Sequence, residues 1–205
     1  MGLLEKITLS PDEIGPEDLD AIHRAGVSVR GLVDATYVCV GFNIIARIAD
    51  ALGFKVPSDE LFVRAARLLR VFGYRRLSGF WMAGSSNGAM QMRETDPYAN
   101  KLEQLRYAVL SGPGSLAPDI RQSISEGDYG SSPLGAFAKK VADHAFMVND
   151  DDIRELHRAH YSDDQIFEAA VSAALGAGLY RLECVLMVLH ADQLASAQQQ
   201  LRISA

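Results

Sequence analysis

Apolar residues recur at spacings of three and four along most of the chain, which is the period of an α-helix that buries one face. Two of these stripes are Leu61, Ala65, Leu68 and Phe72, and Ile166, Ala170, Ala173 and Ala177. Runs of β-branched residues are few, and the one at 38–40 lies inside a longer Ala-rich helical pattern. The pattern therefore predicts an all-α protein of about ten helices.

Short polar side chains followed by acids or glutamine mark the expected helix starts. They occur at 10–13, 58–60, 149–152 and 162–165. A serine or asparagine caps the first free amides of a helix, and an acid in the first turn interacts favourably with the helix dipole. Each of these segments should therefore open a helix.

The helical pattern breaks at 79–97, where a Gly/Ser-rich run at 84–88 is flanked by Met82, Met90 and Met92. Glycine-rich runs of this kind are typical of loops. We predict a loop or lid here, between a first helical region at 1–78 and a second at 98–205. The two regions are expected to pack as one intertwined unit.

An internal repeat relates residues 15–48 to residues 149–182, at the offset of 134 that separates His23 from His157. Identical pairs at this offset are Asp18 and Asp152, His23-Arg24-Ala25 and His157-Arg158-Ala159, Ser28 and Ser162, Ala35 and Ala169, and Arg47 and Arg181. Each copy should form a short helix, a turn at Gly26 or His160, and a long apolar helix. Because neither long helix can be buried alone, we expect the copies to pack about a pseudo-twofold axis.

Net charge and residue spacing argue against nucleic-acid, membrane and metal partners. The net charge of -6 disfavours nucleic acid, and the arginines at 64, 67 and 70 alternate with apolar residues as on a solvated helix face. No uninterrupted apolar run approaches the roughly 18 residues of a membrane span, so a cytoplasmic protein is expected. His157 and His160 lack a third ligand at a suitable spacing, so neither a metal nor a cofactor is expected.

The repeat carries a family resemblance. The runs SDDQIFE at 162–168 and AALGAGLYRLE at 173–183 resemble the alkylhydroperoxidase D and carboxymuconolactone decarboxylase superfamily. The run GFNIIARIADALG at 41–53 is similar to the segment that closes many peroxidase-related members. The resemblance implies an all-α helical array that assembles as dimers, trimers or hexamers. In the peroxidase branch it implies a C-x-x-C redox pair, with a glutamate and histidines as proton relay.

The redox pair itself is missing. Carried onto this chain, the family's glutamate falls on Glu168, its two cysteines on Tyr180 and Glu183, and its following histidine on Met187. The same places in the first copy are Asp34, Ala46, Ala49 and Gly53. Cys39 and Cys184 have no neighbouring thiol, and dithiol peroxidase chemistry needs two sulfurs. We therefore expect that activity to be lost.

Three classes of function stay open. The first is non-thiol acid–base chemistry, with Glu168, Tyr180, Glu183 and His144 as candidate catalytic residues. The second is a catalytically silent, homo-oligomeric helper. The third is a module that binds a small apolar or acidic molecule beneath the methionine-rich lid.

Acidic residues and arginines also repeat with the internal offset. Asp34 precedes Arg47 by 13 residues, and Glu168 precedes Arg181 by the same spacing. This spacing puts the two charges on different faces of one helix, so they cannot meet within a copy. We predict structural ion pairs across the repeats instead, between Asp34 and Arg181 and between Glu168 and Arg47.

Overall fold

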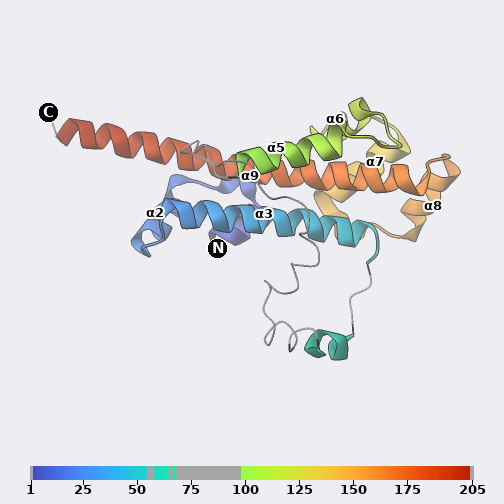
Figure 1. Ribbon diagram of the computed structural model, residues 1–205, viewed down its shortest axis with the longest axis horizontal. Helices are drawn as coiled ribbons and strands as arrows, with labels where there is room; N and C mark the ends of the chain where they lie inside the picture. The colour runs from blue at the N-terminus through green and yellow to red at the C-terminus, as the bar shows by residue number, and fades with distance from the viewer. Residues whose placement is uncertain (1, 55–57, 65–66, 68–97, 204–205) are drawn as a thin grey trace, which may run out of the picture. The chain divides into compact units, whose positions relative to one another are not determined.

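A computed structural model describes residues 2–54, 58–64, 67 and 98–203 (Figure 1). No strand occurs among them, so the all-α prediction is confirmed. In chain order the elements are α1 (Leu3–Leu9), the 3-10 turn η1 (Pro11–Glu13), α2 (Pro16–Arg24), α3 (Val29–Ala51), α5 (Ala99–Arg106), the π-helical turn η2 (Tyr107–Ser111), α6 (Pro118–Ser125), α7 (Pro133–His144), the 3-10 turn η3 (Ala145–Met147), α8 (Asp150–Arg158) and α9 (Asp163–Ile203).

The chain divides into two compact units. One combines Met1–Gly53 with Glu103–Ala205, and the other is Phe54–Leu102. In the second unit the structure describes a helical segment at 59–64 and the first residues of α5. The predicted lid at 79–97, with Met82, Met90 and Met92, lies outside the described residues. The site and the surfaces discussed below all belong to the first unit.

The first unit is built on α3 and α9, which lie side by side and run in opposite directions (Figure 1). Small residues of α9 at the contact allow neighbouring helices to approach closely, and α1, α6 and α7 also pack on this pair. The fully or almost fully buried apolar residues of this part of α9 are Ala169, Ala170, Ala173, Ala174 and Leu175. Burying such side chains is the main stabilising term of the fold.

Most predicted helix starts agree with the structure. Ser28 caps α3 by accepting a hydrogen bond from the Gly31 amide, and Asn149 caps α8 in the same way. Ser162 and Gln165 cap each other's backbone at the start of α9, at 3.0 and 3.3 Å. The start expected at 10–13 gives only η1, because α2 begins after Gly15 instead.

The predicted offset of 134 also relates the observed element bounds. Adding it to α2 gives the bounds of α8, and adding it to the first residue of α3 gives the first residue of α9. The 3-10 turns η1 and η3 match as well. The two predicted turns both use the left-handed backbone region, with φ of 79° at Gly26 and 68° at His160.

Side-chain contacts follow the same offset. Lys6 pairs with Asp18 at 2.9 Å, and its counterpart Lys140 pairs with Asp152 at 2.7 Å. Each pair ties the first helix of one half to the short helix that follows it. The offset therefore relates these two ion pairs as well as the helix bounds.

Two helices of this unit are strongly apolar. Val29–Ala51 and the Asp163–Ala195 part of α9 are long and apolar enough to cross a membrane, judged by length and composition alone. The sequence prediction of no span relied on uninterrupted apolar runs, whereas these helices qualify by mean hydropathy. This is weak evidence for a membrane-spanning segment, because the buried core helix of a soluble protein can meet the same criterion.

Candidate functional site

The Glu168 carboxylate lies near the start of α9 and binds the segment that connects η2 to α6. One oxygen accepts the Ser115 amide at 2.6 Å, and the other accepts the Leu116 amide at 2.8 Å. The Arg121 guanidinium of α6 lies 3.9 Å from the same carboxylate, which is an ionic distance. Both oxygens of Glu168 are therefore engaged by the protein's own backbone.

Arg121 fixes the other end of this segment. Its side chain is 3% exposed and donates to the carbonyls of Val109, at 2.7 Å, and Gly112. These carbonyls lie in and just after the π-helical turn, whose wider winding leaves backbone groups without the usual helical partners. Arg121 thus satisfies carbonyls that the turn frees and brings a positive charge beside Glu168.

Gly114 lets the backbone pass close to the carboxylate. A Cβ atom at this position would lie 2.6 Å from Oε2 of Glu168, well inside van der Waals contact. A pocket of about 280 Å³ adjoins this arrangement, with Arg121 and Glu168 beside apolar walls from Phe167 and Val171. Because the charges of Arg121 and Glu168 offset each other, this pair adds no net charge to the wall of the pocket.

The other candidate catalytic residues do not gather around Glu168. Tyr180 follows it by 12 residues on α9, which is roughly 18 Å along the axis. Glu183 lies further along the same helix and is exposed. His144 ends α7, where its exposed ring makes an edge contact with Phe146.

The acid–base site expected from the sequence is therefore dispersed over separate places in the unit. No family model, curated protein or solved structure matches the chain.

Tyr180 belongs to a different cluster. Its hydroxyl donates a hydrogen bond to the Asp12 carboxylate of η1, and this bond is the main reason that the pKa of Tyr180 is raised to about 12. Cys184, one turn further along α9, is buried, and its burial raises the pKa of its thiol. A buried thiol with a raised pKa is a weaker nucleophile than an exposed thiol of ordinary pKa.

Replacing Asp12 with alanine is expected to return the pKa of Tyr180 from about 12 toward its ordinary value of 10. The raised pKa means that the folded state holds the phenolic proton more tightly than the unfolded state does. The bond's contribution to stability is therefore complete below pH 10 and is lost as the pH rises through about 12. Tyrosinate absorbance during an alkaline titration measures this shift. Glu13→Ala is the control and should leave the titration unchanged.

The two repeated arginines bind carbonyls of the opposite half. Arg47 of α3 donates to the Ala142 carbonyl of α7 at 3.1 Å, and Arg181 of α9 donates to the Thr8 carbonyl of α1 at 3.4 Å. Thr8 and Ala142 are themselves related by the offset of 134. Burial is the main cause that lowers the pKa of Arg47 to about 10, and the nearby Arg181 charge lowers it further.

These contacts replace the cross-repeat ion pairs predicted from the sequence. Asp34 pairs with Arg30 at 2.9 Å, and Glu168 pairs with Arg121. The expectation that each arginine crosses to the other half holds, but its partner there is a helix carbonyl, not an acid. A long guanidinium side chain reaches carbonyls near the end of a neighbouring helix, which its charge also favours.

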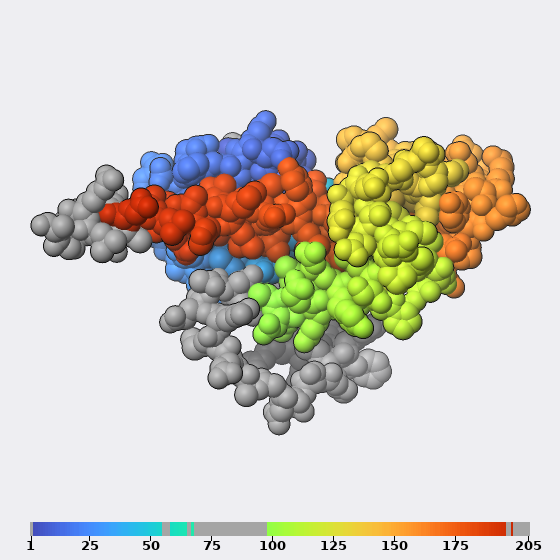
Figure 2. Space-filling model, turned by 90° about the horizontal axis from the view of Figure 1, so that it is seen from above, coloured from blue at the N-terminus to red at the C-terminus, as the bar shows by residue number. Residues whose placement is uncertain are grey.

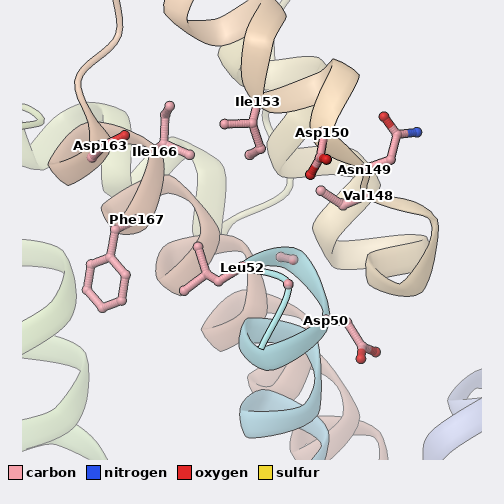
Figure 3. A pocket seen from close by; sticks show the side chains of 11 residues that line it. Asp50, Leu52, Val148, Asn149, Asp150, Ile153, Asp163, Ile166 and Phe167 are labelled. Atoms are coloured by element: carbon pink, nitrogen blue, oxygen red, sulfur yellow. The ribbon is translucent and has the colours of Figure 1, made fainter. Parts of the chain in front are cut away.

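A second pocket, of about 350 Å³, lies at the carboxyl end of α3 (Figure 3). Asp50, Asp150 and Asp163 line it together with apolar residues such as Leu52 and Ile153. Asp163 also lies 3.3 Å from His157. Asp50 lies near the carboxyl end of α3, whereas Asp150 and Asp163 are the first residues of α8 and α9, where the helix dipole favours a negative charge. Within the described ranges, no group of three ligating side chains could hold a metal ion.

Proposed function

We propose that the protein is a homo-oligomeric interaction protein built from a duplicated helical unit, a divergent relative of the alkylhydroperoxidase D and carboxymuconolactone decarboxylase proteins without their redox chemistry. Support for the duplication comes from one offset that relates element bounds, turns, ion pairs and cross-half arginine contacts. Support for the loss of redox chemistry comes from the free cysteines, of which Cys184 is buried and Cys39 is partly buried.

The environment of Glu168 argues against acid–base catalysis. A general base must accept a proton from the substrate, yet both carboxylate oxygens of Glu168 already accept backbone amides. Freeing Oε1 would break the bond from Ser115, and freeing Oε2 would break the bond from Leu116 beside the Arg121 charge. The carboxylate therefore serves better as a structural anchor than as a reactive group.

The observation that carries the interaction role is an apolar surface on α1 and α3. Leu4, Val38, Phe42 and Ile45 are 50%, 60%, 67% and 62% exposed. Three of them lie at spacings of four and three on α3, so they form one continuous stripe. Large contiguous apolar patches on proteins mark interaction surfaces, whereas single exposed apolar residues do not.

The test is the mass of the purified full-length chain, measured by light scattering during size-exclusion chromatography. The proposal predicts a mass at or above twice the 22.3 kDa of one chain. It also predicts no consumption of hydrogen peroxide above that of a Cys39→Ser, Cys184→Ser double variant. A mass of one chain at every concentration, or peroxide turnover that depends on either thiol, would overturn it.

A further inference from the structure

The apolar stripe borders a groove between α1 and α3. The groove has a volume of about 490 Å³, and Leu4, Ala35, Val38 and Phe42 form much of its walls. Its floor carries the polar groups of Thr8 and Asn43, which bind each other at 3.1 Å. The polar groups of the floor are therefore hydrogen-bonded to each other, and the walls are apolar and exposed.

The matching groove in the other half is covered. The counterparts of Leu4, Ala35 and Val38 at the offset of 134 are Ala138, Ala169 and Ser172, and all three are 0% exposed. The covering element is α6, which packs against α9 and α7 (Figures 1 and 2). At Gly176, the counterpart of Phe42, a Cβ atom would lie 2.1 Å from the Ser125 carbonyl of α6. A helix thus fits the groove in the second half.

No described helix of this unit takes the place of α6 over the first groove, where Phe42 stays 67% exposed. The two halves also differ in side-chain size there. Where α6 sits, the floor is made of Gly, Ala and Ser, whereas the open groove presents Leu, Val and Phe. Large side chains at these positions suit a partner helix that contributes small residues between them.

We infer that α3 of a second copy of this chain occupies this surface, antiparallel to the first α3. The inference rests on the self-association proposed above. The apolar face of α3 follows the alternating spacing of four and three that is typical of coiled coils. Its members are Gly31, Ala35, Val38, Phe42, Ile45 and Ala49.

One register of the pair sets each larger residue against a smaller one. When the two helices cross at Val40, Phe42 of one copy faces Val38 of the other, and Ile45 faces Ala35. At the ends, Gly31 faces Ala49. Because the pairing is isologous, every contact occurs twice.

A parallel pair would instead place Phe42 beside Phe42 and Ile45 beside Ile45, so large side chains would meet large ones. The match of side-chain sizes therefore favours the antiparallel arrangement.

The decisive variant is Phe42→Asp in the full-length chain, with Phe146→Asp as its matched control. Phe146 is 74% exposed on η3, outside the stripe, so both substitutions put a charge in place of an exposed phenylalanine. Phe42→Asp buries two carboxylates in one dimer, so we expect it to weaken association at least about 100-fold. Phe146→Asp should leave the association constant unchanged. Circular dichroism confirms that each variant keeps the wild-type helix content, and Ile45→Ala is a milder variant if Phe42→Asp unfolds.

The outcomes separate this inference from the proposed function. If the wild type associates and Phe42→Asp does not weaken it, another surface makes the contact, and the inference fails while the proposed function stands. If the wild type is a monomer at all concentrations, both fail. If the wild type is a monomer that sediments with phospholipid vesicles, and Phe42→Asp abolishes this, the stripe is a lipid surface and the inference is again wrong.

Discussion

Replacing Glu168 with alanine is expected to lower the free energy of unfolding by about 3 kcal/mol, since it leaves the charge of Arg121 buried without its partner. The same change removes the acceptors of the Ser115 and Leu116 amides, whose bonds to a charged group contribute further. Urea unfolding followed by circular dichroism measures the loss. Most of it should come from loosening of the segment between η2 and α6.

Asp164→Ala is the matched control. Asp164 lies one turn before Glu168 on α9, lines the same pocket and is exposed. Its removal should change the free energy of unfolding by less than about 0.5 kcal/mol. Equal stability of the Glu168→Ala variant and the wild type would show that the carboxylate does not anchor this segment, and would restore Glu168 as a candidate for catalysis.

Gly176→Ala is expected to destabilise the fold by a similar amount, about 3 kcal/mol, although alanine is the better helix former. The new Cβ atom would lie 2.1 Å from the Ser125 carbonyl. This atom is backbone, so α6 must move away from α9 to make room. Thermal unfolding should therefore show a clear fall in Tm.

Gly41→Ala provides the opposite expectation on the equivalent long helix. Nothing lies within 4 Å of a Cβ atom at Gly41. The substitution should therefore raise the free energy of unfolding by up to about 1 kcal/mol, because only the helix preference acts. A Gly176→Ala variant that is also stabilised would show that α6 does not seat on α9 as described, and the comparison between the two grooves would lose its basis.

The helices were predictable from the sequence because their signals are local. Ser28, Asn149 and Ser162 each cap the helix that follows them, and the period of the apolar residues gives the rest. The offset of 134 could be read from identities such as His23 and His157, and it also relates the bounds of α2 to those of α8. Repeats are detectable in this way because each copy must solve the same packing problem.

The site was less predictable because its contacts join distant segments. Arg121 lies outside the aligned copies, and nothing in its neighbourhood signals a partner 47 residues away at Glu168. The resemblance selected Tyr180 and Glu183 by their positions along one helix. Positions along a helix do not show which residues of other helices face them. Arg47 and Arg181 were correctly expected to cross between the halves, yet the sequence favoured acids as partners where the structure has carbonyls.

The exposed stripe on α3 could not be separated from a core face by sequence either. Val38, Phe42 and Ile45 have the same spacing that buries Ile166, Ala170 and Ala173 in the other half. What distinguishes the stripe from its counterpart at Ser172 and Gly176 is α6, which packs on α9 there. A periodic apolar pattern predicts that one face of a helix is buried, but it does not show which element buries it.

The most direct test of self-association through α3 is the distance between two spin labels in the dimer, measured by double electron–electron resonance. A single label at Val29→Cys, in a Cys39→Ser background, leaves only the buried Cys184 as a native thiol. The antiparallel register predicts labels separated by roughly 33 Å along the helix axis. A parallel pair would place the labels roughly 10 Å apart, which broadens the continuous-wave spectrum. A dimer that shows neither this broadening nor the separation of roughly 33 Å would mean that α3 is not the interface in this register; either result would contradict the account.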